Sequence, residues 1–324
     1  MECIEKGDTD LNLQLAGLAL MFLVSVFGTS IPLLLRAQLT SAVTLFSFFK
    51  CFGGGVLIST SIIHMLGAAS ESFDNPCLIG FFSSENAYKS WAGAFTLVGI
   101  LSSCFLQIFA AIITYRSKIA SKVNIEFDEP FNHQMYDEAV NSNRIANIFE
   151  VDSKSTNEIV LDEKDSLKIG AYMLEFGVCI HSVLIGMSLS SVGKSQFIPL
   201  LIALSIHQLF ESLAVSAAVS DAFSKDRLKT LILAVIYTLS TPLGCTIGIL
   251  MRGNLMSHSV EGIVIQGVIE AVAAGILLFD AISNLIVPFF KSTEFITGKI
   301  FFQLSCVSAM WLGAVAMSVI GLWA

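Results

Sequence analysis

One apolar run combines the length of a membrane span with two strongly polar side chains: FIPLLIALSIHQLFESLAVSAAV, residues 197–219. About 20 apolar residues are enough to cross the ~30 Å hydrocarbon core of a bilayer as an α-helix. His207 and Glu211 lie four residues apart within this run, so a helix places both side chains on one face. Such residues inside a membrane are costly and usually functional.

The composition extends this membrane interpretation to the whole chain. The 324 residues are 54% hydrophobic and only 14% charged, and the mean hydropathy is +0.76. Soluble domains carry about 25% charged residues. The formal net charge of −8 and the absence of a basic stripe argue against a nucleic-acid-binding protein.

Apolar runs of membrane length recur along the chain. They predict an all-α, polytopic membrane protein with eight transmembrane helices. The predicted spans are 12–35, 45–69, 91–115, 168–191, 197–221, 229–251, 262–287 and 299–323.

The distribution of basic residues predicts the orientation. If the N-terminus lies outside, the inside segments hold 14 of the 18 Lys and Arg residues and the outside segments hold 4. Because Lys and Arg concentrate in cytoplasmic loops, both termini are expected outside the cell or in an organelle lumen. The plasma membrane is the default location for this topology, and an organelle membrane fits it equally.

A polar, mostly acidic segment divides the chain into three parts. Residues 1–116 are expected to form helices 1–3, and 168–324 are expected to form helices 4–8. The segment 117–167 between them is predicted to be a disordered cytosolic loop. A weak metal-sensing loop is the alternative, although its single histidine, His133, argues against a strong metal-binding tract.

The polar residues of the fourth and fifth spans suit a divalent metal. His181 lies in the fourth span, one helix before His207 and Glu211. Two imidazoles and a carboxylate suit Zn²⁺ and Fe²⁺, and three protein ligands leave a position open for water. The alternative is that the histidines form hydrogen bonds between helices. A zinc protease is excluded because Gln208 occupies the position of the catalytic Glu in the H-E-x-x-H motif. No enzymatic activity is therefore expected.

Longer motifs around these residues resemble a known transporter family. HSVLIGMSL at 181–189 and HQLFE at 207–211 resemble the paired signature of the ZIP family of zinc and iron transporters, closest to its plant-type branch. GGGVLISTSIIHML at 53–66 and VSVFG at 24–28 extend the resemblance over nearly the whole chain.

The resemblance implies a carrier that moves Zn²⁺, or also Fe²⁺ or Mn²⁺, toward the cytosol by an elevator-like movement. It implies a 3+2+3 arrangement, in which helices four and five carry the ion between two outer groups of three. The expected partners are divalent metal ions and the bilayer, and a homodimer is a family expectation. No cofactor is expected, because the metal is the substrate.

Residue by residue, the resemblance assigns the metal site to His181, His207, Glu211, Ser182, Gln208 and His64. The two helix-four and helix-five histidines and the carboxylate are the implied ligands, and Ser182 and Gln208 flank them. His64 is implied to lie near the outer entrance.

Several positions depart from the family pattern. Ile185 stands where many members have a Glu that bridges a second metal, so a single-metal site is expected. Gly67-Ala68 replaces the Pro-Asp of the plant-type branch, and Glu71 and Asp74, one and two turns further on, are the candidates to replace the missing entrance carboxylate.

Two carboxylates of the seventh span have no place in the family pattern. Glu270 and Asp280 either pair with a neighbouring helix or form an exit relay toward the cytosol. Outside the spans, a disulfide between Cys3 and Cys77 is left open. Two other functions also stay open, a metal-selective channel and a non-transporting metal-sensing receptor.

Overall fold

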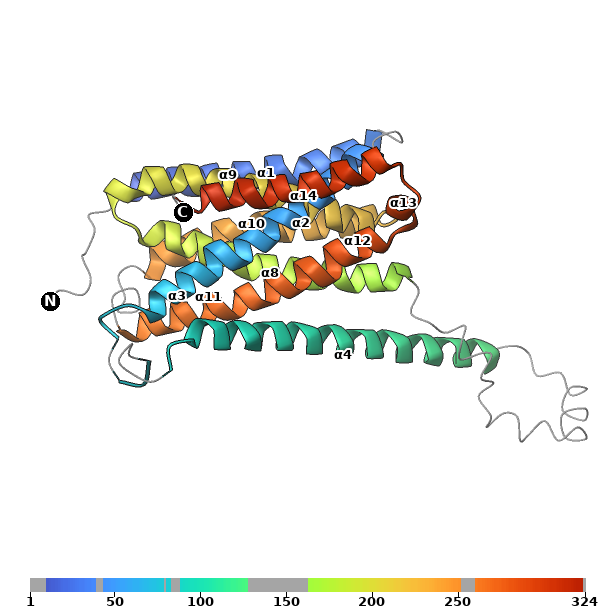
Figure 1. Ribbon diagram of the computed structural model, residues 1–324, viewed down its shortest axis with the longest axis horizontal. Coiled ribbons are helices and arrows are strands. Elements are labelled where there is room, and N and C mark those ends of the chain that lie inside the picture. The colour runs from blue at the N-terminus through green and yellow to red at the C-terminus, as the bar shows by residue number, and fades with distance from the viewer. Residues whose placement is uncertain are drawn as a thin grey trace, which may run out of the picture. The chain divides into compact units, whose positions relative to one another are not determined.

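The computed structural model describes residues 10–38, 43–78, 80–82, 88–127, 163–251 and 260–322. Every element among these residues is a helix, which confirms the all-α prediction (Figure 1). The long helices are α1 Leu11–Gln38, α2 Val43–Ser59, α4 Trp91–Phe127, α8 Glu163–Ser191, α9 Lys194–Ala222, α10 Arg227–Met251, α11 Val260–Asp280 and α14 Ile300–Ile320.

Short elements extend or connect these helices. The π-helical turn η1 (Thr60–Met65) and α3 (Leu66–Phe73) continue α2, and the π-helical turn η4 (Ala281–Ile286) and α12 (Val287–Lys291) continue α11. The remaining short helices are η2 Gly80–Phe82 and α13 Thr293–Ile296. Counting the continuous segments, the described residues contain eight apolar helices long enough to cross a membrane, as predicted.

The segment between α4 and α8 differs from the prediction at its edges. Residues 117–127 continue α4 and residues 163–167 begin α8, so the helices extend into the segment assigned to a disordered loop. Residues 128–162, with His133, lie outside the described part, and their disorder stays a prediction. The chain divides into two compact units, Phe105–Ile169 and the remainder, Met1–Cys104 with Gly170–Ala324.

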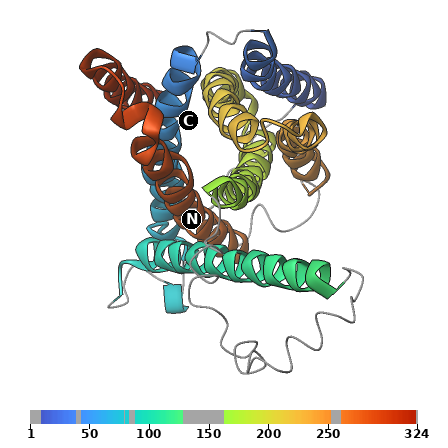
Figure 2. The ribbon, with the colours of Figure 1, turned by 90° about the vertical axis from the view of Figure 1, so that its right-hand side faces the viewer.

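Helix packing within the larger unit brings together segments that are far apart in the sequence. The helix α1 packs against α9 and α10, and α9 also contacts α2. The helix α2 in turn packs against α14 (Figure 2). The helix α11 packs against α3 and η1, the segments that continue α2. The 3+2+3 grouping is not confirmed, because α1 lies with the later helices α9 and α10.

Two glycines let α8 and α10 approach closely beside the candidate site. A Cβ on Gly186 would clash with the backbone of Thr241 and Cys245, and a Cβ on Gly244 would clash with the carbonyl of Val183. Small residues of this kind bring helix backbones together in membranes, where packing replaces the hydrophobic effect as a driving force. The contact fixes α10 beside the stretch of α8 that carries His181.

The cysteines fall into two classes. Cys77, at the end of the span formed by α2, η1 and α3, is disulfide-bonded. Cys3, which the sequence suggested as its partner, lies outside the described residues. The other described cysteines are free thiols within the helices: Cys51, Cys104, Cys179, Cys245 and Cys306.

We expect Gly244→Ala to lower the melting temperature of the purified protein, because the added methyl group collides with backbone rather than a flexible side chain. Overpacking of this kind costs about 1–3 kcal/mol. Gly93→Ala is the matched control, because a Cβ at Gly93 meets nothing within 4 Å. Thermal unfolding followed by size-exclusion chromatography measures both. Equal melting temperatures would show that the α8–α10 contact tolerates a side chain.

Candidate metal site

Three potential ligands converge inside the larger unit. His181 projects from α8, and His207 and Glu211 project from α9. The Nε2 atoms of the two histidines are 3.2 Å apart. Glu211 Oε1 lies 3.7 Å from His181 Nε2, and Glu211 Oε2 lies 3.8 Å from His207 Nε2.

These separations suit one small cation. Two ligand atoms each ~2.1 Å from a tetrahedral zinc ion are about 3.4 Å from one another. The separation of the two histidine nitrogens is slightly shorter than that value, and the two separations that involve Glu211 exceed it by a few tenths of an ångström. Slight movement of the side chains would therefore let His181, His207 and Glu211 bind one ion together.

The sequence of α9 explains why its polar residues face inward. Ile198, Ile202 and Ile206 recur every four residues and form an exposed apolar stripe, which suits contact with lipid. His207 and Glu211 lie on another face and are fully buried. Glu211 Oε1 has no hydrogen-bond partner among the described residues. A buried carboxylate oxygen without a partner is unfavourable, and a bound cation would relieve that cost.

His64 lies beside the cluster rather than within it. Its ring centroid is 6.1 Å from that of His181 and 5.4 Å from that of His207. It comes from the π-helical turn η1, and π-bulges of this type often occur at functional sites. Unlike the two other histidines, His64 is only half-buried. The arrangement is consistent with a residue that an ion meets before the cluster.

Gln208 belongs to a hydrogen-bond network behind the cluster. Its Nε2 donates to Ser25 Oγ of α1 at 3.0 Å and to the Tyr237 hydroxyl of α10 at 2.9 Å. The Tyr237 hydroxyl donates in turn to Glu211 Oε2 at 3.4 Å. Tyr237 therefore connects Gln208 to the carboxylate of Glu211. The role of Gln208 as a flanking residue stays a prediction.

Two flanking residues of α8 have different surroundings. Ser182 is fully buried, and its hydroxyl has no hydrogen-bond partner among the described residues. Its role as a flanking residue stays a prediction. Ile185, which replaces a family carboxylate, packs with Leu189 and Leu204 in an apolar cluster. This apolar side chain offers no ligand for a second metal beside His181.

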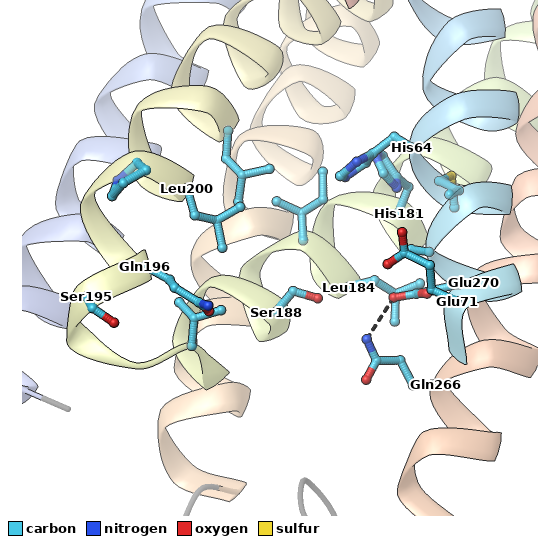
Figure 3. A pocket seen from close by; sticks show the side chains of 16 residues that line it. His64, Glu71, His181, Leu184, Ser188, Ser195, Gln196, Leu200, Gln266 and Glu270 are labelled. Atoms are coloured by element: carbon cyan, nitrogen blue, oxygen red, sulfur yellow. Dashed lines mark hydrogen bonds between the residues drawn. The ribbon is translucent and has the colours of Figure 1, made fainter. Parts of the chain in front are cut away.

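A cavity of about 620 Å³ lies next to the cluster. Its wall includes the exposed residues Ser195 and Gln196 at the start of α9, and also His64 and His181 (Figure 3). His207 and Glu211 lie behind this wall. An ion entering the cavity therefore meets His64 and His181 before it reaches the full cluster.

The two carboxylates of unknown role have separate positions. Asp280 Oδ1 accepts hydrogen bonds from Ser103 Oγ of α4 at 2.7 Å and from Asn284 Nδ2 at 3.0 Å. These contacts favour helix pairing as the role of Asp280, and the exit relay stays a prediction. Glu270 instead lines the cavity together with Glu71.

The sequence analysis missed Tyr237, Ser25 and Glu175. Tyr237 is fully buried in the middle of α10, although tyrosines of membrane proteins gather at the interfaces, and this unusual depth was the available signal. Glu175 is a buried carboxylate of α8, six residues before His181, and its Oε2 has no partner among the described residues. Ser25 carries no signal of its own, since a lone serine is common in membrane helices.

Comparison with known proteins agrees with this geometry. A family model described as "ZIP Zinc transporter" matches residues 11–321. Zinc transporter 5 of Oryza sativa subsp. japonica is 30% identical over 279 residues, covering 85% of this chain and 76% of that protein. Zinc transporter 3 of the same organism is 29% identical, covering 97% of this chain and 89% of that protein.

An iron transporter is similar over the same length. Fe(2+) transport protein 1 of Arabidopsis thaliana is 26% identical over 325 residues, covering 99% of this chain and 88% of that protein. The match of the family model includes all eight apolar helices in full. The chain therefore belongs to the ZIP family, whose members are membrane transporters of divalent metal ions rather than enzymes.

Proposed function

We propose that this protein carries Zn²⁺, with Fe²⁺ or Mn²⁺ as alternative substrates, across a membrane toward the cytosol. One observation carries the proposal: His181, His207 and Glu211 converge between two membrane-spanning helices, beside a cavity that His181 lines. The names of the relatives, zinc transporters and an Fe(2+) transport protein, support the choice of ions. His64, Ser182 and Gln208 are the proposed supporting residues.

The direction follows from the cavity and the charges. Exposed residues of the cavity wall, among them Ser195 and Gln196, lie toward the end of the helices that the distribution of Lys and Arg assigns to the outside. Toward the opposite end, Lys50 of α2 pairs with Asp221 of α9. A state that is open outside and held by an ion pair inside is the state in which an importer accepts its ion.

The contact between α2 and α9 supports an elevator-like carrier. The site lies on α8 and α9, and α9 packs on α1 and α10, while α2 packs on α14. At their contact, Gly53 of α2 leaves no space for a Cβ against Ala214 of α9. Small residues give the two helices smooth surfaces, along which one group can slide past the other.

We expect Glu211→Ala to reduce zinc uptake into liposomes at least tenfold, because it removes the only carboxylate among the three ligands. Zinc influx into vesicles with purified protein is the measurement. Glu261→Ala is the control, since Glu261 is an exposed carboxylate in the first turn of α11. Uptake by Glu211→Ala equal to that of the control would refute the assignment of the site.

Tyr237→Phe should lower zinc uptake at low metal concentration by about 10–100-fold, the usual cost of losing a group that orients a metal ligand. The substitution removes only the hydroxyl that joins Gln208 to Glu211. Tyr172→Phe serves as the control, because Tyr172 is 42% exposed on α8. If both variants take up zinc alike, the network does not orient Glu211.

Competition between ions should separate substrates by ligand preference. We expect Fe²⁺ and Mn²⁺ in excess to inhibit uptake of radioactive Zn²⁺, and Mg²⁺ at the same concentration to inhibit it much less, because imidazole ligands disfavour Mg²⁺. The same assay distinguishes carrier from channel. Uptake that saturates with Zn²⁺ concentration supports a carrier, whereas a linear rise would favour the metal-selective channel. Metal binding without uptake would favour the receptor.

A further inference from the structure

The wall of the cavity carries a pair of carboxylates that the three-ligand cluster does not use. Glu71 comes from α3, and Glu270 comes from α11. Figure 3 shows the two side chains next to each other, with Gln266 hydrogen-bonded to one of them. Both line the same cavity as His64 and His181.

Glu270 is the deeply buried member of the pair. Its exposed fraction is 7%, so more than nine tenths of the residue is inaccessible. Its Oε1 accepts a hydrogen bond from Gln266 Nε2 at 2.9 Å. Its Oε2 has no hydrogen-bond partner among the described residues, although Glu270 lines the cavity. A buried carboxylate oxygen in this state favours a bound cation.

Glu71 adds a second negative charge from a different helix. It is exposed, and Figure 3 places its side chain beside that of Glu270 in the cavity wall. The close packing of α3 on α11 holds the pair together, since a Cβ on Gly267 would lie 3.0 Å from Ser72 and 3.2 Å from the Phe73 ring. No Lys or Arg of the described residues forms an ion pair with either carboxylate. The fold therefore holds two like charges side by side without a protein counter-charge.

We propose that Glu71 and Glu270 form a second cation site, which binds a divalent ion through carboxylate oxygens, with Gln266 as a positioning residue. Oxygen ligands suit Mn²⁺, Mg²⁺ and Ca²⁺ as well as hydrated Fe²⁺, whereas the inner cluster with its imidazoles selects against Mg²⁺ and Ca²⁺. The two sites differ in chemistry, and Glu71 and Glu270 line the cavity, whereas the inner cluster reaches it through His181.

The role of this outer site in transport rests on the proposed function. Paired negative charges in a cleft raise the local concentration of cations and the rate at which they enter. An ion held by Glu71 and Glu270 lies in the same cavity as His64 and His181. The outer site would therefore collect ions at low concentration and pass them inward.

Binding of Mn²⁺ to the purified full-length protein tests the site without reference to transport. Electron paramagnetic resonance measures the free Mn²⁺ that remains in each titration. The measurement uses Glu211→Ala as its background, so that the inner cluster contributes little. We expect this variant to bind one Mn²⁺, and adding Glu270→Gln to weaken that binding at least tenfold. Adding Glu261→Gln is the control for the loss of one negative charge.

Two results would overturn the proposal. One is an unchanged Mn²⁺ affinity after Glu270→Gln, and the other is the absence of binding in the Glu211→Ala background. Glu71→Gln serves as a second variant in case Glu270→Gln misfolds, because Glu71 is exposed and its substitution leaves the buried packing intact. It should weaken Mn²⁺ binding as Glu270→Gln does. Excess Ca²⁺ should displace this Mn²⁺, and failure to do so would also count against a site built from oxygen ligands alone.

Zinc uptake by a protein in which only Glu270 is changed then tests whether the site contributes to transport. Glu270→Gln should raise the zinc concentration for half-maximal uptake about tenfold. This is the lower end of the range by which a charged cleft increases the rate of ion entry. The maximal rate should stay unchanged. A purely structural Glu270 would instead lower the amount of folded protein and leave that concentration as it was. The two proposals fail separately, since Glu211→Ala that retains uptake refutes the inner site and leaves the Mn²⁺ result standing.

Discussion

The structure depends on one constraint: a carboxylate and two imidazoles must be held together away from water. His181, His207 and Glu211 are buried, and their proximity to one another and the hydroxyl of Tyr237 compensate for part of the lost hydration. The arrangement requires α8 and α9 to present these side chains to one another at ligand distance. Among the other helices of the larger unit, α1 and α10 supply the hydrogen-bond network beside the cluster, and α3 and α11 line the cavity.

Support for the site comes from close helix packing and from one hydrogen-bond network. Gly186 and Gly244 allow α8 and α10 to touch through their backbones. That contact places Tyr237 where its hydroxyl meets both Gln208 and Glu211. The close contact of two helix backbones thus sets the position of a polar group in the interior of the protein, and that group donates a hydrogen bond to a candidate ligand.

The cavity combines two kinds of ligand chemistry along a single route. Its wall presents carboxylates at Glu71 and Glu270, and its inner end presents imidazoles at His64 and His181. Carboxylate oxygens hold many divalent ions without strong preference, whereas a mixed nitrogen and oxygen cluster prefers transition metals. In this order, an ion would first bind the less selective carboxylates and then reach the more selective cluster, where it is most dehydrated.

The sequence alone determined the helical class, the eight spans and the three residues of the cluster. Spans follow from run length and hydropathy, and the i, i+4 spacing of His207 and Glu211 is a local property of a helix. Only the tertiary structure decided which helices are neighbours, because membrane helices recognise one another through surface shape that has no simple sequence period. It therefore brought Tyr237 to Glu211, Ser103 to Asp280, and Glu71 to Glu270 across two helices that are distant in the chain (Figure 3).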